Sequence, residues 1–159
     1  MDAIDYQIIR YLIEDGRLPF SQIAAKIGKS TATVHQRAKR LRERGYINSF
    51  TVDLNWEALG YPVDAFVSLR DNESRGLADL SERLRAIPFL RSSAAVTGEF
   101  DLLLHIKARS SSHLGEILDE IRQIAPGPSR TLVTLSTYIA GQVPPLPATE
   151  PDHTGIDQD

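Results

Sequence analysis

The chain has 159 residues, of which 42% are hydrophobic and 25% charged, and its formal net charge is −3. This composition is typical of a folded protein with one ordinary domain or two small ones, and it excludes a disordered chain. Cysteine is absent, which excludes disulfides, thiolate zinc sites and cysteine nucleophiles.

Charge is divided unevenly along the chain. Residues 1–56 carry nine Lys and Arg against six Asp and Glu, whereas residues 57–159 carry nine against fifteen. Such asymmetry predicts that the N-terminal part meets an anionic partner. The first residues lack the basic start and apolar core of a signal peptide, and no apolar run is long enough to span a membrane. We therefore expect a cytoplasmic protein without a membrane partner.

Two short helices are predicted first, over about residues 2–15 and 20–27. In the first, isoleucine and leucine recur at four-residue spacing, which is the period of one buried helix face. The second ends at Gly28, a residue that readily adopts the left-handed conformation found after helices.

A third helix is predicted over about residues 31–44. Ser30 can cap its start by accepting a backbone amide hydrogen bond. Val34, Ala38 and Leu41 lie on one face, which leaves polar and basic residues on the others. Over residues 47–54, apolar and polar residues then alternate and β-forming types are frequent, which predicts a strand or a short wing.

The second half of the chain has the order strand, helix, strand, strand, helix, strand. Alternating or β-branched segments predict strands over 63–69, 90–97, 101–107 and 131–138. Apolar stripes predict helices over 77–87 and 114–124, the latter capped within 110–112. This order is the split ferredoxin-like motif. Its sheet has one bare face that a second subunit would cover, so we expect a dimer.

The first three helices fit a helix–turn–helix. The glycine turn and the buried residues of the third helix would let that helix enter the major groove of DNA. Residues 29–44 hold six Lys and Arg against one Glu, and cations near phosphates release condensed counterions. The candidates for touching base edges are Thr31, Ala32, Thr33, Gln36, Arg37 and Arg40. The alternative is a three-helix protein–protein module with a solvated basic face.

The turn over residues 96–102 is a second candidate site. Gly98 permits a positive φ and the close approach of a ligand. Glu99 and Asp101 can accept from an ammonium group, and turn amides can donate to a carboxylate, so an amino acid would match both. The alternative is an ordinary hairpin turn, which the spacing alone favours.

Nothing in the sequence predicts an enzyme or a metal site. The four histidines are far apart and none pairs with another at helical metal spacing; they are His35, His105, His113 and His153. Glycine-rich phosphate loops are absent, and the serine run over 110–112 is interpreted as a helix cap. We therefore predict no catalytic residue and no metal.

Six motifs share a characteristic order: Asp5-Tyr6-Gln7-Ile8-Ile9; Asp15-Gly16-Arg17; Ile23-Ala24 through Gly28-Lys29-Ser30; Val34 followed by Arg37, Lys39, Arg40 and Leu41; Gly45-Tyr46-Ile47; and Val96-Thr97-Gly98-Glu99-Phe100-Asp101. With these motifs the chain resembles the Lrp/AsnC ("feast–famine") family of bacterial and archaeal regulators over about residues 2–140. The resemblance implies an α+β protein with an N-terminal winged helix-turn-helix and a C-terminal ferredoxin-like βαββαβ module, the RAM domain. It also implies sheet-to-sheet dimers that can form octamers, with an amino acid bound between dimers at the turn before the third strand.

We therefore expect a winged helix-turn-helix over 1–54, a hinge over 55–62, an effector-binding and oligomerising RAM domain over 63–140, and a flexible tail over 141–159. The expected DNA-binding residues are Lys29, Ser30, Thr31, Thr33, Gln36, Arg37, Lys39 and Arg40. Carried over by position, the expected effector-binding residues are Ala95, Thr97, Gly98, Glu99, Phe100, Asp101, Leu102, Val133 and Thr134.

The expected function is a sequence-specific DNA-binding transcriptional regulator that responds to an amino acid or a related small metabolite. Its expected partners are double-stranded DNA, further copies of itself and the effector, with no other cofactor. One alternative is an architectural DNA-binding protein that ignores metabolites. Another is an enzyme, because some haem-pathway decarboxylases resemble the same two-domain architecture, but the basic third helix argues against it.

Overall fold

A computed structural model describes residues 1–71, 76–141 and 143–146. The chain forms two compact units, one made of Met1–Asp53 together with Gly141–Asp159 and the other of Leu54–Ala140. The flexible C-terminal tail that the sequence predicts over 141–159 lies mostly outside the described residues. No helix among the described residues is long and apolar enough to cross a membrane.

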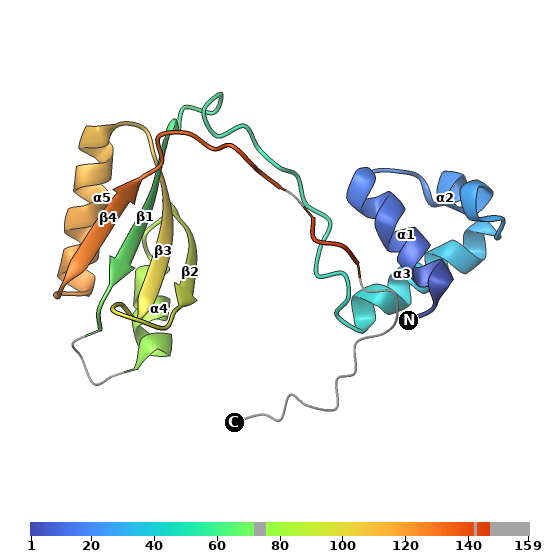
Figure 1. Cartoon of the computed structure of the whole chain (residues 1–159), viewed down its shortest axis with the longest axis horizontal. Helices are drawn as coiled ribbons and strands as arrows, with labels where there is room; N and C mark the ends of the chain where they lie inside the picture. Colours follow the sequence, from blue (N-terminus) through green and yellow to red (C-terminus); the bar gives the residue numbers. More distant parts are fainter. Residues whose placement is uncertain (72–75, 142, 147–159) are drawn as a thin grey trace. The chain divides into compact units, whose positions relative to one another are not determined.

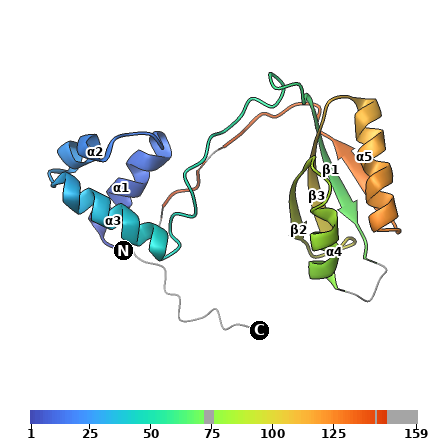
Figure 2. The same cartoon turned by 180° about the vertical axis from the view of Figure 1, so that it is seen from behind.

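The first unit is a bundle of three helices, α1 (Ala3–Glu14), α2 (Phe20–Ile27) and α3 (Thr31–Glu43), as Figures 1 and 2 show. These bounds agree within one residue with the helices predicted from periodicity. Side chains from all three helices form the core, and the fully or almost fully buried members are Ile8, Ile23, Ala24, Val34, Ala38 and Leu41. The apolar spacing thus confirms the inward face of each helix.

Residues 47–54 differ from the sequence prediction, because they form neither a strand nor a wing. Val52 is 70% exposed. A strand needs a second strand to pair its amide and carbonyl groups, and none of the described residues of the first unit forms one. The helix-turn-helix of this chain therefore carries no wing in the structure.

The second unit is a four-stranded antiparallel sheet with two helices. Its elements are β1 (Val63–Leu69), α4 (Leu77–Leu84), β2 (Leu90–Ala95), β3 (Leu102–Ala108), α5 (Ser111–Ile124) and β4 (Ser129–Val133). The strand order is β2-β3-β1-β4, which is the arrangement that two interleaved βαβ units produce. The predicted ferredoxin-like fold is confirmed.

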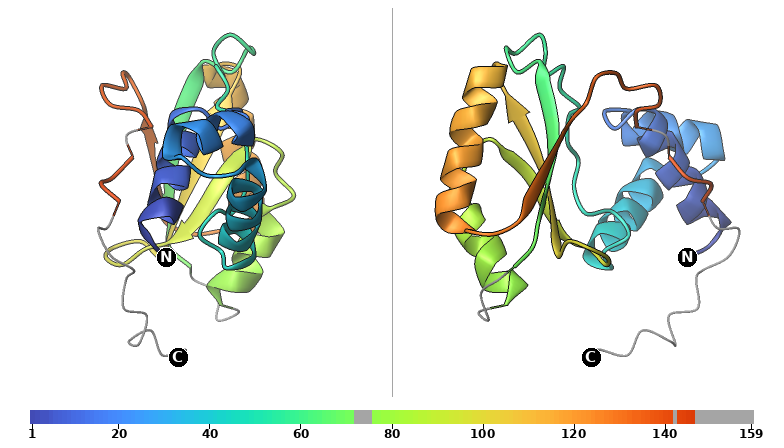
Figure 3. Two further views of the ribbon diagram at one scale, coloured as in Figure 1. Left: turned by 90° about the vertical axis from the view of Figure 1, so that its right-hand side faces the viewer. Right: turned by 60° about the vertical axis from the view of Figure 1, so that its left-hand side comes forward.

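Both helices cover the same face of the sheet, as Figure 3 shows. Ala65 and Val67 of β1 and Leu104 and Ile106 of β3 are fully buried against them. Strand alternation places the intervening side chains on the opposite face. No described helix of this unit covers that second face, which we call the open face.

The last strand is shorter than the sequence predicts. β4 ends at Val133, whereas the β-branched run predicted a strand to residue 138. Its partner β1 begins at Val63 after Pro62, and the amide of Thr134 makes the last bond, to the Asp64 carbonyl at 2.8 Å. Since proline has no amide to offer, the pairing stops there.

Candidate DNA-binding surface and effector turn

The turn between α2 and α3 is built by two local signals. Gly28 ends α2 with φ of 66°, and the amide of Lys29 donates to the carbonyl of Ala24 at 3.0 Å. Ser30 then caps α3, because its hydroxyl accepts the amide of Thr33 at 3.1 Å. Glycine tolerates the left-handed backbone, and the cap satisfies one of the first free amides of the helix. The sequence therefore fixes the direction in which α3 leaves the turn.

The outward side of α3 is polar and basic. Gln36 and Arg40 are exposed, whereas Val34 and Leu41 face the core. Arg40 makes no ion pair with any described side chain, and Lys39 lies 3.7 Å from Glu43. Thr33 is half-buried, and its hydroxyl lies 2.8 Å from that of Ser30. Arg40 is therefore an exposed cation on this side of the helix with no ion-pair partner among the described residues.

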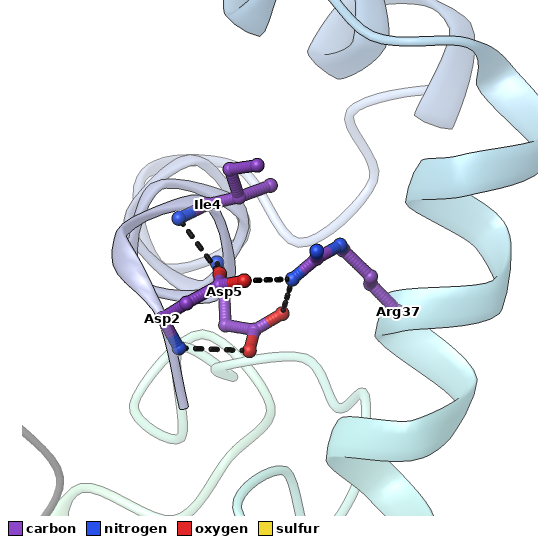
Figure 4. A network of polar contacts seen from close by, with 4 residues as sticks. All are labelled: Asp2, Ile4, Asp5 and Arg37. Atoms are coloured by element: carbon purple, nitrogen blue, oxygen red, sulfur yellow. Dashed lines mark hydrogen bonds and ion pairs between the residues drawn. The ribbon is translucent and has the colours of Figure 1, made fainter.

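Arg37 does not point outward. Its guanidinium donates to Asp2 at 2.7 Å and to Asp5 at 2.8 Å, so that α3 is tied to the start of α1 (Figure 4). Asp2 and Asp5 also form a capping box, in which each side chain accepts the backbone amide of the other. We call these three residues the α1–α3 clamp.

Charge in the clamp is stabilised by its own hydrogen bonds. The bond from Arg37, followed by the bond from the Asp5 amide, holds the pKa of Asp2 below its usual value. The bonds to Asp5 and Asp2 raise the pKa of Arg37. Asp2 and Arg37 are therefore ionised at neutral pH. Because its guanidinium is bonded to both carboxylates, Arg37 is not free to bind a base as the sequence led us to expect.

The turn between β2 and β3 is closed by backbone bonds. The amide of Val96 donates to the Asp101 carbonyl, and the amide of Asp101 donates to the Leu69 carbonyl, both at 2.9 Å. Gly98 has φ of 123°, a conformation that strongly favours glycine. Residues 96–99 are exposed. The turn thus presents its backbone to solvent in a defined shape.

Two arginines hold this turn from neighbouring strands. Arg70 donates twice to the carbonyl of Glu99, at 2.9 and 2.6 Å. Arg130 of β4 lies 3.9 Å from the Glu99 carboxylate, and its guanidinium stands 5.6 Å from the centre of the Phe100 ring. Neither arginine is assigned to the turn by the sequence, because only the strand register brings them there.

The two carboxylates of the turn have different roles. Asp101 is half-buried and accepts the amide of Asp71 at 2.9 Å. Glu99 is exposed, and the only partner of its carboxylate among the described residues is Arg130, at 3.9 Å. Glu99 is therefore the carboxylate better placed to accept from a ligand, while Asp101 holds the backbone of the turn.

Three other expected effector residues lie away from the exposed surface of the turn. Leu102 is 2% exposed and packs in the core of the second unit. Val133 pairs with Ala65, whereas the turn lies beside Leu69. Four residues of strand span about 13 Å, so Val133 and Thr134 are far from the turn of the same chain. The β4 residue beside the turn is Arg130.

A polar cluster lies on the open face of the sheet. Asp64 lies 2.5 Å from His105 and 3.0 Å from the ammonium of Lys107, and the His105 ring stacks on Phe66 with centres 4.7 Å apart. Burial raises the pKa of Asp64, but the hydrogen bonds from Lys107 and His105 outweigh it, so the net pKa is lowered. The carboxylate is therefore ionised on a face that is otherwise partly apolar.

The other histidine positions have structural contacts. His113 is 8% exposed, and its Nδ1 accepts the amide of Arg109 at 3.0 Å. The His35 ring meets Phe20 edge to face. His153 lies outside the described residues. Within the described ranges, no cluster of His, Asp or Glu has the geometry to hold a metal ion.

The fold and its two surfaces define a class: a helix-turn-helix protein joined to a ferredoxin-like ligand module. Residues 1–42 match the family model of the AsnC-type helix-turn-helix domain, and residues 64–144 match that of the Lrp/AsnC ligand binding domain. The chain belongs to the Lrp/AsnC family. It is a DNA-binding transcriptional regulator with a ligand-binding domain, and the enzyme alternative is excluded.

Named relatives agree with this assignment. The chain is 34% identical to the HTH-type transcriptional regulator FL11 of Pyrococcus abyssi, over 87% of this chain and 91% of that protein. It is 31% identical to the regulator LrpA of Mycobacterium tuberculosis, over 87% and 92%. Among solved structures, a feast or famine regulatory protein from M. tuberculosis complexed with L-methionine matches with a TM-score of 0.82 and 31% identity, covering 87% of this chain and 95% of that one.

Proposed function

We propose that this protein is a sequence-specific regulator that reads DNA with α3 and responds to an amino acid bound at the β2–β3 turn. The observation that carries the DNA part is the outward side of α3, where Gln36 and Arg40 are exposed and no described carboxylate pairs with Arg40. Helix-turn-helix proteins place such a helix in the major groove, where arginine grips guanine and glutamine grips adenine.

We retain seven of the eight expected DNA-binding residues as DNA contacts. Arg37 instead holds α3 against α1 in the α1–α3 clamp. Lys29 and Lys39 would neutralise phosphates, and the start of α3 offers the remaining polar contacts, from Ser30, Thr31 and Thr33. Replacing Arg40 by Ala tests this assignment. If Arg40 touches phosphate, affinity falls on all duplexes and the salt slope falls by about one unit; if it grips a base, discrimination falls by about 1–3 kcal/mol at one position.

Fluorescence anisotropy with promoter and unrelated duplexes, at several salt concentrations, gives both quantities. A matched control is Arg17→Ala, which removes an exposed arginine outside α3. Equal affinity of the Arg40→Ala protein and the unsubstituted protein for every duplex would refute the proposal.

The effector part is supported by the exposed turn, its positive-φ glycine and the adjacent side chains of Glu99 and Arg130. An amino acid offers an ammonium for Glu99 and a carboxylate for exposed turn amides and Arg130. Ala95, Thr97, Gly98 and Phe100 would shape the pocket around them. Val133 and Thr134 stay in the proposal only as residues contributed by another copy, because the register separates them from the turn of their own chain.

Calorimetry with a panel of free amino acids, L-methionine included, tests the effector. The expected result is saturable heat that Glu99→Gln weakens by about tenfold, since a charge-assisted bond is lost. A protein that binds DNA but gives no heat with any amino acid would instead be the effector-independent architectural protein.

We also propose a homodimer through the open face. Leu132 is 56% exposed there, opposite Phe66 in the register. Sedimentation velocity tests this, and Phe66→Arg should convert the protein to monomers, because a buried unpaired charge opposes association. A protein that is monomeric without any substitution would refute it; the same experiment separates dimer from octamer.

A further inference from the structure

A cavity of about 570 Å³ lies in the first unit, beside the C-terminal half of α3. Its volume is within the range of about 300–1,000 Å³ that is usual for small-molecule sites. Of its lining residues, the DNA-binding proposal uses Lys39 alone and the effector proposal uses none. It is formed by α2, α3 and the segment that follows α3, so all its residues belong to one compact unit.

The apolar part of the cavity is aromatic. Phe20 contributes from α2 and Phe50 from the segment after α3, with Ile47 beside them. Phe50 is 46% exposed although it is a large apolar residue. Aromatic side chains that line a cavity are suited to a flat ring, because stacking and edge contacts stabilise such a ligand beyond its buried area.

The polar part of the cavity is mostly cationic. Arg42, Lys39 and His35 line it, and Glu43 is the one carboxylate among its described residues. Glu43 lies 3.7 Å from Lys39, and no carboxylate in the described ranges pairs with Arg42. The Arg42 guanidinium stands 5.9 Å from the centre of the Phe50 ring, so a cation and an aromatic face meet at the same place.

We propose that this cavity binds a small aromatic carboxylate. The ring lies between Phe20 and Phe50, and the carboxylate accepts from Arg42, with Lys39 adding positive potential. An arginine fork matches the two oxygens of a carboxylate better than those of any neutral group. The proposal goes beyond the amino-acid effector at the β2–β3 turn, which lies in the other unit.

The test uses the full chain without DNA, so that its outcome does not depend on the DNA-binding proposal. Benzoate is the probe, benzyl alcohol has the ring without the charge, and acetate has the charge without the ring. Calorimetry gives the affinities, and NMR shows whether the benzoate ring protons contact the rings of Phe20 and Phe50. We expect benzoate to bind with those contacts and both reference compounds to bind at least roughly tenfold more weakly, since each lacks one of the two interactions.

Arg42→Gln should weaken benzoate binding by roughly tenfold through the lost charge-assisted bonds. Arg40→Gln is the matched control on the same helix and should leave benzoate binding unchanged, because Arg40 does not line the cavity. Hydrogen exchange of the α3 amides shows whether each variant is folded, and the NMR contacts in the unsubstituted protein stand if a variant is not.

Four results would overturn the proposal. They are absence of benzoate binding, equal binding of benzyl alcohol, equal loss in both arginine variants, and benzoate contacts at the β2–β3 turn in place of Phe50. A change of oligomeric state in the Arg42→Gln protein, with benzoate affinity unaltered, would show that the cavity is instead a contact between copies, and would equally overturn it.

Discussion

Removal of Arg37 should unfold the helix-turn-helix more readily without removing a DNA contact. The Arg37 side chain is 22% exposed and that of Asp5 is 16% exposed, whereas that of Asp2 is 53% exposed. Hydrogen bonds between charged groups contribute about 1.5–3 kcal/mol when shielded and less than about 1 kcal/mol when exposed. The Asp5 bond thus dominates, and Arg37→Met should cost about 2 kcal/mol while retaining the apolar stem.

Hydrogen exchange measures the loss in free energy of unfolding of the first unit separately from that of the second. A loss of about 2 kcal/mol corresponds to roughly 30-fold faster exchange of the most protected α1 and α3 amides. The amides of β3 should not change, because that strand belongs to the other unit. Arg40→Met is the control, and as an exposed substitution it should alter stability by less than about 0.5 kcal/mol.

The two variants should therefore separate stability from DNA affinity. At a temperature where both remain folded, Arg40→Met should weaken DNA binding, with a lower salt slope if Arg40 touches phosphate or lost base discrimination if it binds a base, and Arg37→Met should retain both. Asp5→Asn combined with Arg37→Met should cost less than the sum of the single changes, because both remove the same bond. If Arg37→Met leaves exchange unchanged and lowers the salt slope as Arg40→Met does, the clamp is not the role of Arg37.

Further consequences concern the cap, the effector turn and the open face. Ser30→Ala should cost about 1 kcal/mol through the lost cap of α3, seen as faster exchange in its first turn; unchanged exchange there would contradict the cap. Gly98→Ala should cost about 1–2 kcal/mol at the positive φ and weaken amino-acid binding in calorimetry, whereas full affinity would show that the turn conformation is not used. The folded pKa of Asp64 lies below its ordinary value of 3.8, so its contribution to stability is complete above that value and is lost as the pH falls through the folded pKa. In acid titrations followed by circular dichroism, Asp64→Asn should thus be less stable at neutral pH and show a flatter loss below about pH 4; an identical acid profile would refute the assignment.

Local signals in the sequence predicted most of the fold. The helix bounds follow from apolar spacing, and the capping role of Ser30 depends on residues within three positions of it. The strand pattern of the second unit gave the correct order of elements, from which the ferredoxin-like sheet follows. These features were predictable because the physics that determines them acts over a few neighbouring residues.

The exceptions depend on contacts between distant residues. Arg37 and Arg40 are identical in type and three positions apart, yet only Arg37 meets the carboxylates at the start of α1, more than thirty residues earlier. The strand predicted over 47–54 did not form for a related reason. Alternation of apolar and polar residues indicates that a segment can be extended, but it does not indicate which other strand would pair with it. Arg130 lies beside the β2–β3 turn because of the register between β1 and β4, and residue types alone do not specify that register.

The distribution of the basic residues also changes the expected electrostatics of DNA binding. Counted from the sequence, residues 29–44 offer six cations, which at about 0.9 units for each neutralised phosphate would give a salt slope of about −5 per subunit. In the structure Arg37 is held by the clamp, Arg42 faces Phe50, and Arg44 stands over Tyr46. Only Lys29, Lys39 and Arg40 remain to face phosphates, so the slope should be nearer −3 per subunit. The basic run therefore serves as much to build the first unit as to attract DNA, and a slope near −5 would show that these arginines leave their partners when DNA binds.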